Sequence, residues 1–387
     1  MRQSLGLVQP VTTGIVAAVV GFASAFAIVL QGLAGVGASP AQAASGLLML
    51  CVGQGLLAIF LSLRTKKPIS IAWSTPGAAL LMGAGVQQGG FGVAITAFLI
   101  AGMLAIVAGA WRPLGRAVES IPMSLASAML AGVLLELCLA PVHAVADMPA
   151  LALPIVAAWM AGWCLARRYA VLIAVAVTVV IVAVSTQMPP DAIGLLRPKV
   201  IFVEPVPDFV AALGIAIPLF IVTMASQNVP GIAVLKTNGY ETPAGEVFVS
   251  TGLATMLVAP FGAHALNLSA ITAALCAGPE AGPDPAKRYV ASVAAGVAYI
   301  ILGLLAGFAA AFMASSPPQL IQAVAGLALL SSLAAALATA LSNEQHRLAA
   351  VVTFITAASG IHILGVGAAF WGLVAGGVLL LLERRRG

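Results

Sequence analysis

Charged residues are scarce in this chain. Asp, Glu, Lys and Arg together make up 7% of its 387 residues, whereas hydrophobic residues make up 61%. Soluble domains carry about 25% charged residues, and so few charges cannot cover the surface of a water-soluble protein of this size. The scarcity excludes a soluble enzyme, and it means that the formal net charge of +5 is no sign of nucleic-acid binding. Because apolar runs of about 20 residues recur, we expect an all-α integral membrane protein.

Clusters of reactive side chains are also missing. The four cysteines, Cys51, Cys138, Cys164 and Cys276, lie inside apolar runs without paired spacing, which is typical of small core residues rather than disulfides or metal ligands. The sequence has no catalytic dyad, metal-ligand cluster or nucleotide-binding loop, so we expect neither an enzyme nor a cofactor. The N-terminal stretch MRQSLGLVQP contains no cleavage site after a short apolar core, so we expect no removable signal peptide.

Apolar segments between turn signals are predicted to cross the membrane fourteen times. Several are short or interrupted by Gly or Pro, so their boundaries are approximate. The segments cover residues 11–32, 43–63, 69–86, 91–110, 118–140, 150–166, 169–186, 208–227, 246–261, 264–278, 287–313, 319–340, 347–363 and 365–382.

The basic residues provide an independent test of this number, because cytoplasmic loops of membrane proteins are enriched in Lys and Arg. With the N-terminus in the cytoplasm, the inside segments hold every basic residue of the chain except Arg197 and Lys199. A wrong number of spans would scatter the basic residues over both sides. The distribution therefore predicts fourteen spans with both termini in the cytoplasm.

A faint internal repeat divides the chain into two halves. Gln31 near the end of span 1 and Gln227 near the end of span 8 are 196 residues apart, and each is followed by a Gly-containing stretch. Leu80 in AALLMGAG and Leu275 in AALCAG are 195 residues apart. Halves of seven spans have opposite orientations in the membrane. The faint repeat therefore predicts seven-plus-seven inverted repeats. This is an architecture of secondary transporters, and it places the binding site at the repeat interface.

Spans 3 and 10 have an unusual pattern. ISIAWSTPGAALLMGAG (69–85) and HALNLSAITAALCAG (264–278) each begin with a segment that suits an extended backbone and end with a helix too short to span alone. The run Ser74–Gly77 suits the start of a helix, and either Asn267 or Ser269 suits a helix cap. Extended backbone at membrane depth needs hydrogen-bond partners, which two facing segments supply for each other.

Two helix N-termini that face one point form a site for a small monoanion. Each N-terminus presents unpaired N–H groups and about half a positive charge, so no buried lysine is needed. The lack of Lys and Arg in this region argues against a tightly held dianion such as sulfate. The predicted substrate-binding residues are Gln31, Trp73, Ser74, Thr75, Pro76, Gly77, Ser226, Gln227, Asn228, Pro230, Gly231, Asn267 and Ser269.

The stretch TMASQNVPGIAVL (223–235) places polar residues and Pro-Gly directly after an apolar run. It predicts that the helix breaks at Val229–Gly231 so that Ser226–Asn228 face a cavity. The alternative is that these amides only bond a neighbouring helix, as polar residues in membrane helices often do. That alternative is the better interpretation for Gln31, whereas a ligand or gating contact is the better one for Ser226–Asn228.

The block TMASQNVPGIAVLKTNGY, together with VLQGLAGVG and AWSTPGAAL, resembles the benzoate/proton symporter family of bacterial inner membranes. The resemblance extends over essentially the whole chain, and that family is similar in fold to the uracil-permease-like nucleobase and ascorbate transporters. It implies a core domain of spans 1–4 (residues 1–117) and 8–11 (208–314). It also implies a gate domain of spans 5–7 (118–207) and 12–14 (315–387), elevator-like movement between the two domains, and a possible homodimer.

The sequence departs from the nucleobase relatives at one informative place. Those relatives carry carboxylates in spans 8 and 10, where this chain has Gln227, Asn228 and Asn267. A carboxylate would repel an anionic substrate, whereas an amide accepts one. The amides therefore favour a carboxylate ligand and leave the proton site unassigned.

A proton partner follows from the charge of such a substrate. An aromatic carboxylic acid titrates near pH 4 and is an anion at pH 7, and an inside-negative potential opposes its entry by about 2.3 kcal/mol per 100 mV. Glu136, the one acidic residue in the interior of an apolar span, is either a proton carrier or a structural ion-pair partner. His264 is either a carrier or a loop or cap residue. A third route is entry of the neutral acid itself.

The sequence thus predicts import of benzoate or a similar aromatic monocarboxylate with a proton across the bacterial inner membrane. One alternative is a nucleobase/proton symporter. Another is an anion channel of the same fold, which uphill accumulation would exclude.

Overall fold

The computed structural model describes residues 2–111, 122–185, 197, 199–363 and 366–384. Within these residues the chain is mostly helical, and eight helices are long and apolar enough to cross a membrane. The chain is therefore a multi-pass membrane protein. The fourteen spans and the inverted repeat remain predictions. Four residues used in the charge argument, Arg112, Arg116, Arg385 and Arg386, lie outside the described residues.

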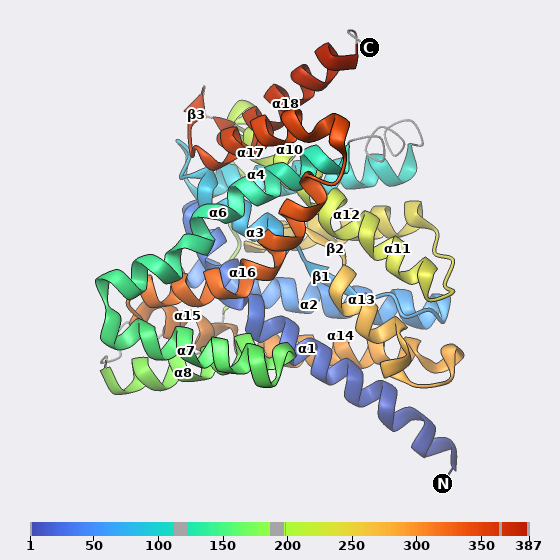
Figure 1. Ribbon diagram of the computed structural model, residues 1–387. Helices are drawn as coiled ribbons and strands as arrows, with labels where there is room; N and C mark the ends of the chain where they lie inside the picture. The colour runs from blue at the N-terminus through green and yellow to red at the C-terminus, as the bar shows by residue number, and fades with distance from the viewer. Residues whose placement is uncertain (1, 112–121, 186–196, 198, 364–365, 385–387) are drawn as a thin grey trace.

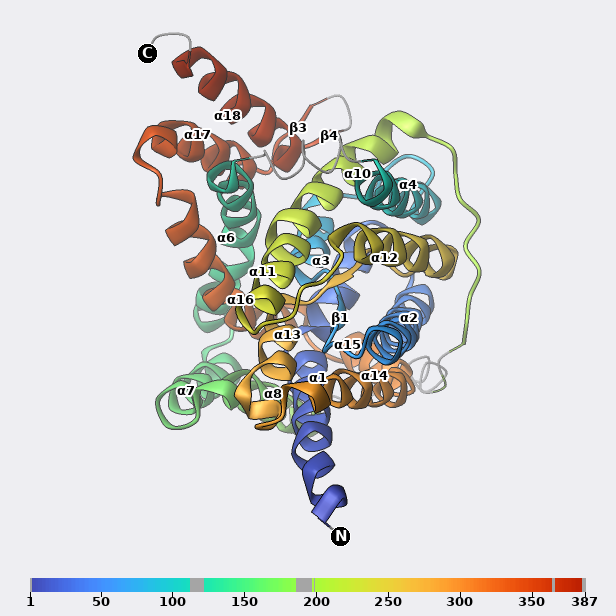
Figure 2. The ribbon, with the colours of Figure 1, turned by 90° about the vertical axis from the view of Figure 1, so that its right-hand side faces the viewer.

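The helices form two groups that lie side by side (Figure 2). The first group holds α1 (Arg2–Gly35), α2 (Pro40–Thr65), α3 (Thr75–Ala84), α4 (Phe91–Ala110), α10 (Phe209–Thr223), α11 (Val229–Thr237), α12 (Ala244–Val258), α13 (Ala270–Ala277), α14 (Tyr289–Gly303) and α15 (Ala306–Ser315). The second group holds α6 (Met123–Asp147), α7 (Pro149–Leu165), α8 (Ala170–Ser185), α16 (Pro318–Ala340), α17 (Arg347–Ala358) and α18 (Ala368–Arg384). The groups meet where α1, α3 and α10 pack against α6, α8, α16 and α18.

Two short strands cross at the centre of the first group. β1 (Ile71–Trp73) pairs antiparallel with β2 (Leu266–Leu268), so that Ala72 lies opposite Asn267. Two further bonds extend the pairing, because Ser74 N donates to Ala265 O at 3.0 Å and Ser269 N donates to Ser70 O at 2.9 Å. The strands thus satisfy each other's backbone groups away from water, and the expected extended segments of spans 3 and 10 are confirmed.

The expected helix break at Val229–Gly231 is wrong. The chain stays helical from α10 through a π-helical turn, η3 (Met224–Asn228), into α11. The π-turn bonds Val229 N to Met224 O, five residues back. Pro230 has no N–H and its ring crowds the preceding turn, and the wider π-turn just before it lets the helix continue without a break.

Two other predicted spans are less regular than expected. The segment 287–313 is divided at Leu304–Leu305 into α14 and α15. The segment 347–363 ends its helix at Ala358, and a two-residue pairing of β3 (His362–Ile363) with β4 (Val366–Gly367) follows. Gly360, with a φ of 65°, turns the chain between α17 and β3, which is a backbone conformation that favours glycine.

Loops predicted to be cytoplasmic meet on one side of the molecule. Arg64 Nη2 lies 3.0 Å from Glu246 Oε1, and Tyr240 OH donates to Pro285 O at 2.8 Å. In Figure 1 the first turns of α1 and the last turns of α18 lie on the right, as does the connection between α11 and α12. The orientation of both termini in the membrane remains a prediction.

Candidate functional site

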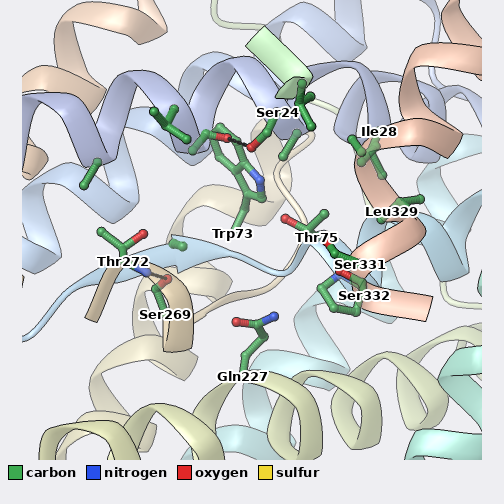
Figure 3. Close-up of a pocket in the computed structure, with 18 of the residues that line it drawn as sticks. Ser24, Ile28, Trp73, Thr75, Gln227, Ser269, Thr272, Leu329, Ser331 and Ser332 are labelled. Atoms are coloured by element: carbon green, nitrogen blue, oxygen red, sulfur yellow. Dashed lines mark hydrogen bonds between the residues drawn. The ribbon is translucent and has the colours of Figure 1, made fainter. Parts of the chain in front are cut away.

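A cavity of about 230 Å³ lies where the two strand–helix segments meet the second helix group. Pockets for drug-sized ligands are about 300–1,000 Å³, so this cavity suits a smaller molecule. Figure 3 shows polar side chains converging on it from several elements. Its polar lining comprises Ser24, Thr75, Gln227, Ser269, Thr272, Tyr299, Ser331 and Ser332, and among the described lining residues none carries a charge at neutral pH.

Helix α3 begins at the cavity. Ser74 caps it: the Ser74 Oγ accepts from Gly77 N at 3.0 Å and from Thr223 Oγ1 at 2.8 Å. Ser74 is fully buried and therefore serves the helix rather than the cavity. The next two residues, Thr75 and Pro76, line the cavity. Of the four residues predicted for the run Ser74–Gly77, Thr75 and Pro76 therefore line the cavity, whereas Ser74 and Gly77 do not.

Helix α13 begins at the same cavity. Ser269 rather than Asn267 is its cap, because the Ser269 Oγ accepts from Thr272 N at 3.1 Å. Both Ser269 and Thr272 line the cavity. Ser74 and Ser269 are 195 residues apart, which is the offset that the sequence repeat predicts. The positive ends of α3 and α13 thus flank one space, and N–H groups and hydroxyls there can donate to an anion.

An aromatic wall closes one side of the cavity. Trp73 and Tyr299 pack edge to face with ring centroids 5.7 Å apart, and Phe22 contacts Trp73 from beyond at 6.1 Å. Trp73 and Tyr299 both line the cavity together with Ile28 and Leu329. This wall offers a flat apolar ring the contacts that aromatic pairs favour.

The π-turn contributes one residue to the cavity and not three. Gln227 points into it (Figure 3). Ser226 Oγ instead donates to Val222 O, so it is bound to its own helix. Asn228 is buried, and its Oδ1 accepts from Leu268 N at 2.8 Å. Asn228 therefore holds strand β2 in place from behind the cavity.

Four other predicted residues lie outside the cavity lining as well. Gly231 packs against Leu268, because a Cβ at this glycine would lie 2.8 Å from the leucine side chain. Pro230 follows the π-turn in α11. Gln31 is on α1, and neither of its amide atoms has a hydrogen-bond partner among the described residues. Asn267 donates from Nδ2 to Leu268 O at 2.9 Å.

The two proton-coupling candidates occupy different surroundings. His264 is fully buried against Phe98, with ring centroids 6.4 Å apart, and neither ring nitrogen has a hydrogen-bond partner among the described residues. Glu136 lines a second, smaller cavity of about 50 Å³ at the C-terminal end of α3 and between the two helix groups. The described residues form no salt bridge with Glu136, so the structural ion pair considered for it is not observed.

Several lining residues were missed by sequence reasoning. Ser24 and Tyr299 come from α1 and α14, and Ser331 and Ser332 come from α16 of the second group. The close approach of α1 to Tyr299 depends on Gly21, where a Cβ would collide with the tyrosine hydroxyl. A lone Ser or Tyr in an apolar helix does not show which neighbouring element it will face, although the Ser331-Ser332 pair is visible in the sequence as a polar spot in its span.

Comparison with known proteins identifies the family of the chain. Residues 7–382 match the family model described as benzoate membrane transport protein. The chain is 40% identical over 378 residues to the inner membrane protein YdcO of Escherichia coli (strain K12), which covers 96% of each chain. It is 30% identical over 325 residues to a benzoate membrane transport protein of Acinetobacter baylyi, which covers 84% of this chain and 82% of the relative.

Solved structures of anion transporters share the fold. The transmembrane domain of the cyanobacterial bicarbonate transporter BicA matches with a TM-score of 0.60 at 15% identity, covering 98% of this chain and 97% of that one. SLC26A9 matches with a TM-score of 0.65 at 15% identity, covering 98% of this chain and 66% of that one. These likenesses concern the fold alone. The family model and the relatives together show that the chain belongs to the benzoate membrane transport protein family and is a membrane transport protein rather than an enzyme.

Proposed function

We propose that this protein imports benzoate or a similar aromatic monocarboxylate together with a proton across the bacterial inner membrane. The observation that carries the proposal is the uncharged cavity at the N-termini of α3 and α13, with Trp73 on one wall. Helix N-termini favour an anion, and the wall of Trp73 and Tyr299 favours a flat ring. The relative named as a benzoate membrane transport protein supports the same ligand.

The size and charge of the cavity support a monocarboxylate over the alternatives. A space of about 230 Å³ admits one small ring. Because its described lining lacks both carboxylates and basic side chains, a monoanion meets neither repulsion nor an excess of positive charge. A nucleobase would need hydrogen-bond partners along two edges of its ring, and the Ile28 and Leu329 side chains in the lining offer none.

Glu136 is the residue we propose for proton coupling. It lines the cavity at the far end of α3 from the substrate, beside Gly83 and Ala84. The helix between the two cavities has ten residues, which is about 15 Å at 1.5 Å per residue. One short rigid element thus touches the substrate site with one end and the Glu136 cavity with the other. Among the described residues of that second cavity, Glu136 is the one titratable side chain.

The proposed movement is a displacement of the first helix group, as the core domain (residues 1–117 and 208–314), against the second, as the gate domain (118–207 and 315–387). Both cavities lie between the groups and take residues from each. A displacement would therefore change the surroundings of substrate and Glu136 together. Such joint change is what coupling of a proton to a solute requires.

The deciding experiment is uptake of labelled benzoate into proteoliposomes that contain the purified protein. We expect saturable accumulation above the outside concentration when the proton gradient is inward, and equilibration when it is absent. Protein-free liposomes are the control, because neutral benzoic acid crosses lipid unaided. Saturable uptake that never exceeds the outside concentration would indicate a channel. Absence of protein-dependent benzoate uptake, with uptake of uracil or another nucleobase instead, would favour the nucleobase alternative.

A further inference from the structure

Two adjacent serines, Ser331 and Ser332 on α16, line the substrate cavity from the second helix group. Figure 3 shows both beside Thr75, at the N-terminus of α3. Ser332 is half-buried and Ser331 is exposed. The remainder of α16 packs mainly against α6, within its own group. The serine pair is therefore a polar face that α16 presents to the substrate cavity of the first group.

These two hydroxyls differ from most hydroxyls in the helices of this protein. Thr178 Oγ1 donates to Ala174 O at 2.8 Å, and Ser315 Oγ donates to Ala311 O at 2.8 Å, so each is satisfied within its own helix. Such back-bonding is the usual state of Ser and Thr inside helices. The Ser331 and Ser332 hydroxyls form no hydrogen bond with any of the described residues. Their hydroxyls are free to bind a molecule in the cavity.

The N-terminus of α3 has few donors left for an anion. Gly77 N donates to Ser74 Oγ at 3.0 Å, and Ala78 N donates to Ser74 O at 2.8 Å. Pro76 has no N–H to offer. Thr75, with its N–H and its hydroxyl, is what remains of the first turn at the cavity. A carboxylate accepts about four hydrogen bonds, so another element must supply the remaining donors to a carboxylate held there.

We infer that Ser331 and Ser332 donate hydrogen bonds to the carboxylate of the substrate held at the N-terminus of α3. The inference rests on the proposed function, because it takes the ligand to be a monocarboxylate. It adds that the anion is held by both helix groups: Thr75 binds it from the first group and the serine pair binds it from the second. Any displacement of one group against the other then breaks the serine contacts while those to α3 are kept.

The test measures binding of labelled benzoate to the purified full-length protein at pH 7. The variants are Ser331→Ala, Ser332→Ala and the double variant, and Ser250→Ala serves as the matched control, because Ser250 is a half-buried serine on α12 outside the cavity. Hydrogen bonds to charged groups are strong, so we expect the double variant to raise the Kd for benzoate by about tenfold or more. We expect Ser250→Ala and Ser332→Thr, which keeps the hydroxyl, to stay within about twofold of wild type.

Benzamide separates a carboxylate contact from a general loss of fit. It has the same ring without the charge, so the double variant should change its inhibition constant much less than the Kd for benzoate. Equal weakening of both ligands, or wild-type affinity for benzoate in the double variant, would overturn the inference. If the wild-type protein binds no benzoate, the proposed function fails. The inference is then tested by the shift in melting temperature that acetate, nicotinate or chloride causes. A shift seen in wild type and lost in the double variant supports the inference, whereas a shift that the double variant keeps, or the lack of any shift in wild type, overturns it.

Discussion

The two strand–helix segments of this protein are built alike and used differently. β1–α3 and β2–α13 each run from a three-residue strand through a capping serine into a short helix, and Ser74 and Ser269 are 195 residues apart. Thr272 corresponds to Gly77 at this offset. Thr272 lines the cavity, whereas Gly77 packs against Leu219, where a Cβ would lie 2.5 Å from the leucine. The shared scaffold sets the position of two helix ends, and single side chains decide what each end offers.

The far ends of the two helices differ in charge. α3 ends beside the cavity that Glu136 lines. α13 ends at Ala277, whose carbonyl accepts from Arg288 Nη1 at 2.8 Å, and Arg288 Nε donates to Gly282 O at 2.8 Å. A cation at a helix C-terminus is stabilising. The α13 segment thus ends at the permanent charge of Arg288, whereas the α3 segment ends beside the cavity that Glu136 lines.

The largest effect is expected for Glu136, beside the C-terminal end of α3. Glu136→Gln should abolish accumulation of benzoate driven by an inward proton gradient, because a carboxamide cannot carry a proton. Exchange of labelled for unlabelled benzoate should persist, because the substrate cavity is intact. Both are measured in proteoliposomes. Glu280→Gln is the matched control, since Glu280 follows α13 as an exposed carboxylate, and it should accumulate benzoate normally. Normal gradient-driven accumulation in Glu136→Gln would remove Glu136 from the coupling.

The next effect tests the aromatic wall. Trp73→Ala should weaken benzoate binding by about 10–100-fold, because burial of a large apolar side chain contributes about 1.5–3 kcal/mol. Leu266→Ala is the control, because Leu266 lies opposite Trp73 across the strand pair and outside the cavity lining. It should lower the melting temperature and leave the Kd nearly unchanged. Equal losses of affinity in both variants would mean that Trp73 acts through the sheet.

A smaller effect concerns Asn228, which holds strand β2 from behind the cavity. Asn228→Ala removes the acceptor of Leu268 N and should lower the free energy of unfolding by about 1–3 kcal/mol, because a buried N–H loses its partner. Ser226→Ala, which removes only a bond within one helix, should change stability little. Thermal unfolding in detergent measures both. Lost benzoate binding with an unchanged melting temperature in Asn228→Ala would instead place its side chain on the substrate.

The smallest effect tests the charge at the α13 end. Arg288→Gln should lower stability by about 1 kcal/mol, through weaker bonds to the Ala277 and Gly282 carbonyls and loss of the helix-end charge. Lys287→Gln removes an exposed pair with Asp284 and should cost about 0–1 kcal/mol at most. Thermal unfolding at low and high salt compares them. An equal, salt-sensitive loss in both variants would show that Arg288 acts only as a surface charge.

Sequence reasoning located five residues of the site but misjudged the backbone of the helix beside it. It placed Trp73, Thr75, Pro76, Gln227 and Ser269 at the site, and the structure brings all five to one cavity. The locations followed from helix-cap chemistry and from polar residues in apolar surroundings, which are local signals. It also expected a broken helix where a π-turn is found, because Pro-Gly signals a break without specifying whether a wider turn can absorb it.

Residues that depend on packing between distant elements escaped that reasoning. Asn228 and Gln227 are neighbours in the sequence, yet one holds the backbone of β2 and the other faces the cavity. The direction of each side chain is set by the π-turn, which rotates the helix face by an amount that no local pattern specifies. Tyr299 and the serines of α16 join the cavity only because α14 and α16 happen to pass beside it.

The amino-acid sequence by itself determined that the chain is a helical membrane protein with two short strand–helix segments, because hydropathy, charge distribution and caps act over a few residues. Only the tertiary structure decided which polar side chains meet in one cavity, and that Glu136 lies at the far end of the helix that begins at that cavity. The reason is physical: the burial and orientation of a side chain depend on neighbours that are up to hundreds of residues away along the chain.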